Sequence, residues 1–156
     1  MIYKGNFDII EGNFLIVASR FNEFVVDKLV EGAKGAFDML GNREVTYDIA
    51  YCPGAAELPF LAKVGAQTSR YEAIIALGAV IRGETSHYDV VVGVTTNGLA
   101  KVSQEFNIPV LMGILTTDTV EQALNRAGIK GGNKGYEAAL GAFEMVSVAR
   151  QIATRA

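Results

Sequence analysis

The sequence predicts an α/β fold: a three-layer sandwich with a central four-stranded parallel sheet flanked by helices on both faces. Two observations support this prediction. Short apolar runs alternate with longer segments of helical spacing, which is the pattern of parallel βαβ units. The apolar runs have hydrophobic residues at consecutive positions, as strands covered on both faces do. Right-handed crossovers then place helices on both sides of the sheet.

The first half of the chain supplies two strands and two helices. Residues 13–19, "NFLIVAS", form an uninterrupted apolar run that is typical of a buried strand. Between Asn22 and Gly41 the apolar residues recur every three or four positions, and these two residues suit the two ends of a helix. Residues 44–52, "EVTYDIAYC", are expected to form the second strand, and 53–69 to form a turn followed by a helix.

The second half repeats the pattern. Residues 71–80 are apolar on both faces and predict a third strand, and 108–117 predict a fourth. The helix expected at 86–107 contains several β-branched residues. A shorter helix is expected from Asp118 to residue 128, with Asp118 as its cap and Glu121 as the partner in a capping box.

A long final helix is expected at 132–155, and one domain is expected over residues 1–156, because no linker, repeat or low-complexity tract interrupts the pattern. Residues 1–10 precede the alternation and contain several large apolar side chains. We expect this segment to be extended and to add a strand to the sheet of a neighbouring subunit.

Composition excludes several classes of function. The net charge is −3 and no basic run is present, which argues against nucleic acid and membrane surfaces as partners. No apolar run reaches the roughly 18 residues of a membrane span, and no signal peptide is recognised at the start of the chain. The single cysteine and single histidine cannot form a zinc site, so no metal is expected. The lone cysteine also favours a reducing, cytoplasmic location.

The chemistry is expected where the strands end, because ligands of open parallel sheets bind at the carboxyl ends of the strands. Four polar or glycine-rich segments lie there: "SRFNE" (19–23), "CPGAAE" (52–57), "GAVIRGETSH" (78–87) and "GILTTD" (113–118). The third has the glycine spacing of a phosphate-binding loop. Glu84 stands at the lysine position, however, which excludes a nucleotide triphosphatase of that class.

Three side chains in these segments suit catalysis or binding. His87 has the type of side chain best suited to shuttle a proton, although a partly buried histidine that caps a helix or bonds to a carbonyl is the alternative. Phe21 suits stacking on a planar heterocycle, or a hydrophobic staple at the start of the helix. Glu57 suits hydrogen bonds to hydroxyl groups, or a favourable place in the first turn of a helix.

Cations accompany the glycine-rich segment near the end of the chain. Arg126 ends one expected helix, and Lys130 and Lys134 lie close to the start of the next. Together they suit a phosphate, although an arginine at a helix C-terminus is favoured by the helix dipole alone. Cys52 is not expected to be a nucleophile, because no base is available to activate it.

Five segments strengthen this interpretation: "SRFNEFVVDKLVEGA", "PGAAELPF", "LGAVIRGETSHYD", "GILTTDTVEQALNRAG" and "KGGNKGYEAAL". In this order and spacing they resemble the 6,7-dimethyl-8-ribityllumazine synthase family of riboflavin biosynthesis, over nearly the whole chain. The resemblance implies a transferase that condenses 5-amino-6-(D-ribitylamino)uracil with 3,4-dihydroxy-2-butanone 4-phosphate and releases phosphate and water. It implies no metal and no organic cofactor.

The resemblance also implies roles for individual residues. His87 would be the catalytic proton shuttle, and Phe21 would stack on the pyrimidine. Glu57 would hold ribityl hydroxyls, and Arg126 would bind the phosphate. The complete substrate-binding set that it implies is Phe21, Asn22, Ala55, Ala56, Glu57, Ala79, Val80, Ile81, Gly83, Glu84, Thr85, Met112, Arg126 and Lys134.

Three positions depart from the family's usual pattern. Ala56 stands where an aromatic residue is frequent, Ala79 where threonine is common, and Met112 where a phenylalanine of a neighbouring subunit often meets the pyrimidine. Each change removes contact area, so we expect weaker substrate binding and retained activity.

Assembly follows from the same resemblance. The family forms homopentamers with active sites between adjacent subunits, some of which build icosahedral shells of 60 subunits, and riboflavin synthase is a candidate partner. Extra residues in the connection at 128–135 tend to block the shell, and the short connection here favours it over the free pentamer. Two alternatives stay open: a flavin- or nucleotide-binding protein without catalysis, and a shell-forming protein whose pocket has drifted.

Overall fold

The computed structural model describes residues 1–41 and 43–154, and these residues form one sheet of four parallel strands in the order β2-β1-β3-β4. The strands are β1 (Glu11–Ser19), β2 (Glu44–Cys52), β3 (Ala73–Ile81) and β4 (Val110–Thr117). The helices are α1 (Glu23–Met39), the 3-10 turn η1 (Ala55–Glu57), α2 (Leu58–Gln67), α3 (His87–Phe106), α4 (Val120–Arg126) and α5 (Lys134–Ala153).

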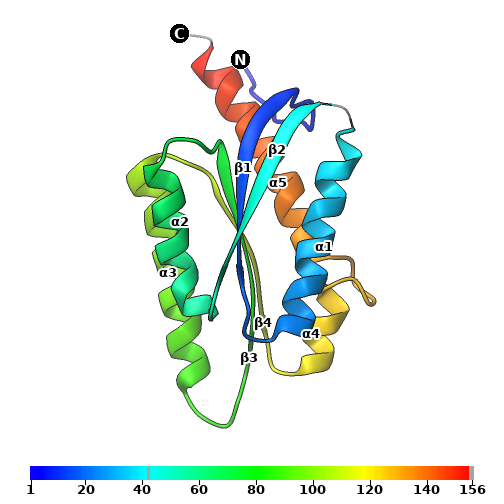
Figure 1. Ribbon diagram of the computed structural model, residues 1–156, viewed down its shortest axis with the longest axis vertical. Coiled ribbons are helices and arrows are strands. Elements are labelled where there is room, and N and C mark those ends of the chain that lie inside the picture. The colour runs from blue at the N-terminus through cyan, green and yellow to red at the C-terminus, as the bar shows by residue number, and fades with distance from the viewer. Residues whose placement is uncertain (42, 155–156) are drawn as a thin grey trace.

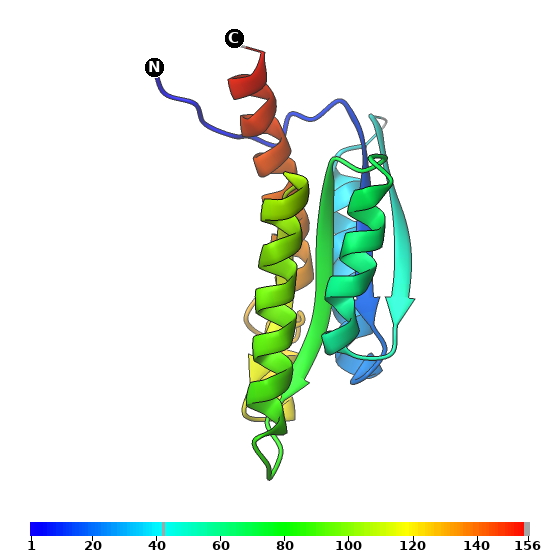
Figure 2. The same cartoon turned by 90° about the vertical axis from the view of Figure 1, so that its left-hand side faces the viewer.

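The predicted three-layer sandwich is confirmed. Helices α2 and α3 cover one face of the sheet, and α1, α4 and α5 cover the other (Figure 1, Figure 2). Strand β3 lies between β1 and β4, and every residue in it except the last is buried. This is the burial that a strand with consecutive apolar residues requires. Strand β2 is at the edge of the sheet and is only partly buried.

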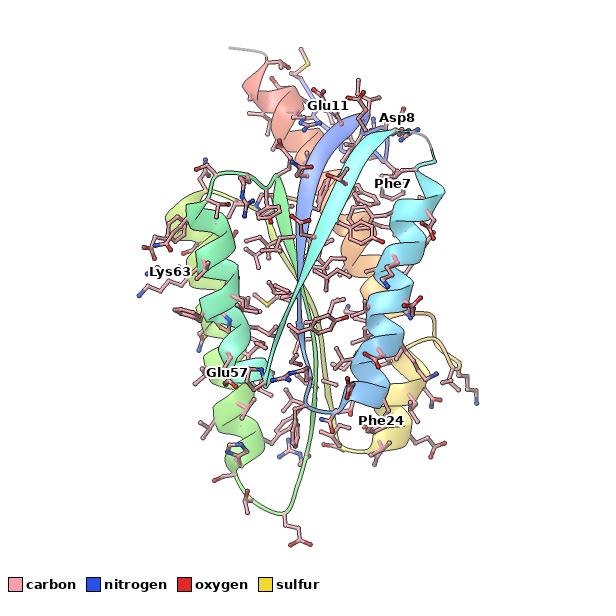
Figure 3. The ribbon with its side chains drawn as sticks, viewed as in Figure 1. Phe7, Asp8, Glu11, Phe24, Glu57 and Lys63 are labelled. Atoms are coloured by element: carbon pink, nitrogen blue, oxygen red, sulfur yellow. The ribbon has the colours of Figure 1, made fainter. Side chains whose placement is uncertain are left out.

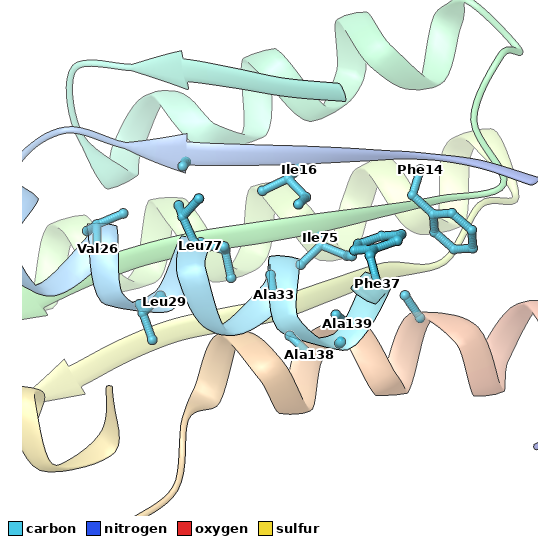
Figure 4. Packing of buried hydrophobic residues seen from close by; sticks show 14 of the residues in the cluster. Phe14, Ile16, Val26, Leu29, Ala33, Phe37, Ile75, Leu77, Ala138 and Ala139 are labelled. Carbon is cyan, nitrogen blue, oxygen red and sulfur yellow. The ribbon is translucent and has the colours of Figure 1, made fainter. Parts of the chain in front are cut away.

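An aromatic cluster anchors the face covered by α1 and α5. Phe14 of β1, Phe37 of α1 and Phe143 of α5 meet edge to face, with ring centroids 5.0–5.5 Å apart. Figure 4 shows Phe37 beside Ile75, at the centre of this buried layer. Edge-to-face pairs of this kind add roughly 0.5–1.5 kcal/mol each beyond their buried area. The three rings therefore join strand β1 to both helices.

Helices α1 and α5 approach closely where α5 begins. A Cβ atom at Gly135 would lie 2.7 Å from the carbonyl carbon of Leu29 and 2.9 Å from its Cα. Only a residue without a side chain fits there. Asn133, two residues before Gly135, caps α5 by accepting hydrogen bonds from the N–H groups of Gly135 and Tyr136. It thereby fixes the start of the helix beside α1.

Residues 1–10 form no strand within this chain. They run along the C-terminal part of α5, where Gln151 Nε2 donates to the Lys4 carbonyl at 2.8 Å and the Asn6 N–H donates to Ser147 Oγ at 3.3 Å. Ile2 and Ile10 remain largely exposed. Pairing of this segment with a neighbouring sheet therefore stays a prediction. Within the described ranges, no helix combines the length and apolarity needed to cross a membrane.

Candidate active site

A cavity of about 540 Å³ opens at the carboxyl ends of β1, β2 and β3. The chain leaves β1 toward the α1 face and leaves β3 toward the α3 face (Figure 1). Ligands of open parallel sheets bind where adjacent strands turn to opposite faces in this way, and the cavity lies at that point. Loops after all three strands contribute to its wall. Its lining residues are Phe21, Asn22, Pro53, Gly54, Ala55, Ala56, Glu57, Ala79, Val80, Ile81, Gly83, Thr85, His87, Tyr88 and Val91.

The loop between β1 and α1 presents Phe21 to this cavity. The backbone N–H of Phe21 donates to the Pro53 carbonyl at 2.9 Å, which joins the loop to the end of β2. The phenyl ring is 71% exposed, far more than a hydrophobic staple leaves. This exposure argues against the staple, and stacking of Phe21 on a heterocycle stays a prediction.

Asn22 connects the same loop to β3. Its Nδ2 donates to the Ala79 carbonyl at 2.9 Å, and its backbone lies in the left-handed region with φ 62°. Asparagine adopts this region more readily than most residues. Asn22 occupies the N-cap position of α1 as expected, but its side chain makes no capping hydrogen bond. The side chain holds the walls of the cavity together instead.

The loop after β2 contributes a stretch of small residues followed by a carboxylate. Ala55 and Ala56 belong to the 3-10 turn and leave space beside the strand ends. Glu57 follows, is exposed, and lies where β2 passes into α2 (Figure 3). The carboxylate is therefore free of burial and able to accept hydrogen bonds from a bound polyol.

Cys52 lies immediately before this loop and does not have the properties of a nucleophile. The thiol is 5% exposed and donates to the Gly54 carbonyl at 3.3 Å. Burial, reinforced by the nearby carboxylate of Glu57, raises the pKa of Cys52 to about 11. A thiol with this pKa is almost entirely protonated at neutral pH, and the thiolate is the reactive form.

The loop after β3 brings in Gly83, Thr85 and His87. His87 is the first residue of α3, is exposed, and lines the cavity. Its backbone N–H donates to Thr85 Oγ1 at 3.3 Å, so Thr85 also supports the start of the helix. A Cβ at Gly83 would meet no atom of the described residues within 4 Å, so a ligand is able to approach the backbone there.

Four predicted binding residues do not line the cavity of a single chain: Glu84, Met112, Arg126 and Lys134. Glu84 is exposed in the loop after β3, and Met112 packs on β4 beneath α3. Arg126 ends α4, on the opposite face of the sheet from α3 (Figure 1), and its Nη1 donates to the Gln122 carbonyl at 3.1 Å. Lys134 opens α5 on that face. One chain does not bring Met112, Arg126 or Lys134 to the cavity that His87 lines.

Four lining residues escaped sequence reasoning: Pro53, Gly54, Tyr88 and Val91. Pro53 and Gly54 belong to the "CPGAAE" segment, in which the predicted binding residues come directly after them. Tyr88 and Val91 lie one and four positions after His87. Helical spacing from the histidine is the signal that would have found Val91, since residues four apart share a face of a helix.

Comparison with known proteins identifies the family. The sequence profile of 6,7-dimethyl-8-ribityllumazine synthase matches residues 11–150. The chain belongs to the 6,7-dimethyl-8-ribityllumazine synthase family. Relatives bearing this name include a protein of Chlorobium phaeobacteroides (strain BS1), 49% identical over 96% of both chains, and one of Prosthecochloris aestuarii, 50% identical over the same shares. A third, from Deinococcus deserti, is 52% identical over 89% of both chains.

Family membership makes this chain a transferase of riboflavin biosynthesis. The recognition made from five sequence segments is confirmed, and nothing favours the two non-catalytic alternatives. The family's reaction joins a ribitylated aminopyrimidine to a four-carbon ketone phosphate. The lining of the cavity described above includes an aromatic ring, a carboxylate and an imidazole, each from a different loop.

Proposed function

We propose that this enzyme condenses 5-amino-6-(D-ribitylamino)uracil with 3,4-dihydroxy-2-butanone 4-phosphate in the cavity at the ends of β1, β2 and β3. One observation carries the proposal: Phe21, Glu57 and His87, from three separate loops, line the same space. Phe21 stacks on the pyrimidine, and Glu57 accepts hydrogen bonds from ribityl hydroxyls. Backbone groups of Ala55 and Val80 complete the contacts to the pyrimidine and its chain.

His87 moves the protons. The pyrimidine amine attacks the ketone, and loss of water forms a Schiff base. Elimination of phosphate leaves an enol that tautomerises to a ketone. The ribitylamino nitrogen closes the ring on that ketone, and loss of a second water gives the lumazine. Holding two substrates in contact supplies most of the acceleration. General acid–base catalysis adds about 10²–10⁴-fold. An exposed imidazole at the first residue of α3 is accessible to both reacting groups, which supports this role.

The decisive test is turnover. Wild-type protein mixed with both substrates should generate the lumazine chromophore, and His87→Ala should lower kcat by roughly 10²-fold or more. A binding protein without catalysis would form no chromophore in either case. A His87→Ala enzyme with wild-type kcat would remove the proton-shuttle role.

The phosphate ligands are proposed to come from an adjoining protomer. Arg126 and Lys134 lie on the face of the sheet opposite α3, beyond the reach of the cavity in their own chain. Gly83, Glu84 and Thr85 approach the phosphate from the cavity's own loop, and Met112 of the adjoining protomer meets the pyrimidine. Exposed apolar side chains such as Phe24, Phe60 and Val90 support burial between protomers.

Subunit complementation tests this arrangement. His87→Ala and Arg126→Ala should each be nearly inactive alone. Assemblies formed at random from equal amounts of the two variants should regain about one quarter of wild-type activity. Each interface has a one-half chance of an intact His87 on one side and a one-half chance of an intact Arg126 on the other, so one interface in four is complete. Failure of the mixture to exceed the separate variants would place both side chains in the same chain's site.

The assembly itself is proposed to be a homopentamer, with a 60-subunit shell favoured by the short connection between α4 and α5. Light scattering on purified protein separates the two by particle mass. Riboflavin synthase, which would consume the lumazine, is the proposed partner, and co-purification tests it. A cytoplasmic location fits the free thiol of Cys52.

A further inference from the structure

The loop that presents His87 is held by contacts of Arg82, a residue with no role in the proposed chemistry. Arg82 is the first residue after β3, and its backbone N–H donates to the Thr117 carbonyl at 2.8 Å. Its Nε donates to Asp118 Oδ1 at 2.9 Å, just beyond the end of β4. Arg82 is thus bonded to the end of the neighbouring strand β4 through both its backbone and its side chain.

The same guanidinium reaches across the loop to α3. Its central carbon lies 4.3 Å from the ring centroid of Tyr88, and its Nη1 lies 3.9 Å from Asp89 Oδ1. Tyr88 lines the cavity directly after His87. Arg82 therefore joins the two ends of the segment that contains Gly83, Thr85 and His87, and it ties both ends to β4.

Other restraints on this segment are few. Ser86 occupies the N-cap position of α3 without a capping hydrogen bond from its side chain. Residues 82–87 are all exposed, and the bond from the His87 N–H to Thr85 Oγ1 is long at 3.3 Å. With so little packing beneath the loop, the stacked and paired guanidinium is the principal contact that limits where the start of α3 can move.

We propose that Arg82 is a positioning residue, which holds the start of α3 so that the imidazole of His87 meets the reacting groups. The inference rests on the proposed function of His87. Because the side chains of Arg82, Asp89 and Asp118 are about half or more exposed, their ion pairs contribute little to stability. Loss of the Arg82 contacts should therefore lower kcat more than it lowers stability, since displacement of a catalytic group by about 1 Å is able to cost up to 10²-fold in rate.

Arg82→Gln tests the proposal by steady-state kinetics. We expect kcat to fall about tenfold, KM for the ribitylaminopyrimidine to change less than about threefold, and the thermal midpoint to move by less than about 2 °C. Arg150→Gln is the matched control. Arg150 also pairs with an exposed carboxylate, Glu72 at 3.5 Å, but at the opposite end of the sheet, so its kcat should stay at the wild-type value.

A double-mutant cycle shows whether Arg82 acts through His87. In the His87→Ala background, Arg82→Gln should lower kcat by less than about twofold, because the group that it positions is gone. A full tenfold loss in that background, or a large rise in KM for the ketone phosphate with unchanged kcat, would overturn the inference and make Arg82 a direct ligand. If Arg82→Gln keeps the wild-type kcat while His87→Ala is inactive, the positioning role of Arg82 is wrong and the proposed function stands. If His87→Ala keeps the wild-type kcat, the proposed function itself is wrong.

Discussion

Replacement of Asn133 is expected to destabilise the enzyme far more than its surface position suggests. Its Oδ1 accepts hydrogen bonds from the N–H groups of Gly135 at 2.8 Å and Tyr136 at 3.0 Å, which caps α5. Its Nδ2 donates to the carbonyls of Lys28 in α1 at 2.9 Å and Ala127 at the end of α4 at 3.1 Å. One amide therefore joins three helices.

The expected magnitude follows from these four bonds. Loss of an N-cap costs about 1 kcal/mol, and each lost donor bond costs about 1 kcal/mol or somewhat less where water replaces it. Asn133→Ala should therefore lower the free energy of unfolding by about 2–4 kcal/mol. In a chain of this size, about 1 kcal/mol moves Tm by 2–4 °C, so a decrease of roughly 4–16 °C is expected.

Asn133→Asp separates the cap from the clamp. The carboxylate still accepts the two capping bonds, and the N-terminus of a helix favours its charge. It loses both donor bonds and turns an acceptor toward two carbonyls, so it should still lower stability by about 2 kcal/mol. Asn125→Ala is the control, since that side chain forms no hydrogen bond among the described residues and should change stability by less than about 0.5 kcal/mol.

Thermal and urea unfolding, monitored by circular dichroism at one fixed protein concentration, measure these differences, because self-association makes Tm depend on concentration. An Asn133→Asp protein as stable as the wild type would refute the reasoning. It would mean that the bonds to α1 and α4 contribute nothing, and that Asn133 is only a helix cap.

Three further changes have defined outcomes. Gly135→Ala forces a Cβ against the backbone of Leu29, which no rotamer change relieves, and should cost about 1–3 kcal/mol in urea unfolding; a fully stable variant would show that α1 and α5 separate freely. Burial raises the pKa of Cys52 to about 11, whereas the thiol of the unfolded chain has a pKa near 9. The contribution of this thiol to stability is therefore intact below pH 9 and is lost as pH rises through 11, and Cys52→Ser should remove this decline. Rapid alkylation of native Cys52 at pH 8 would contradict its burial. Ala56→Phe adds a ring to the cavity wall and should lower KM for the pyrimidine several-fold, and an unchanged KM would show that the space beside Ala56 is not where the ring binds.

Local patterns predicted the elements well where flanking residues set sharp limits. Strand β2 covers the predicted residues 44–52, because Pro53 and Gly54 cannot continue it in the sheet. Strands β1, β3 and β4 differ from prediction by one or two residues at their ends, and β4 begins only after Pro109, which the predicted strand included. The turn and helix expected at 53–69 are observed as the 3-10 turn η1 and helix α2, which begins at Leu58, one residue before Pro59.

Local patterns failed where a distant partner takes a side chain. The cap of α4 was predicted at Asp118 with Glu121 as partner, but Thr119 is the cap and Gln122 its partner. Asp118 is unavailable because its carboxylate accepts from Arg82. Asn22 likewise gives its side-chain amide to the Ala79 carbonyl, 57 residues away, instead of to its own helix.

The sequence by itself determined the layers of this protein, the family to which it belongs and the types of side chain available for its chemistry, because apolar periodicity and motif spacing are properties of neighbouring residues. Only the tertiary structure decided which of those side chains share a space. The strand order β2-β1-β3-β4 and the face to which each strand's loop turns bring Phe21, Glu57 and His87 together and leave Arg126 across the sheet. Such proximity depends on non-local pairing of strands, which no stretch of contiguous residues encodes.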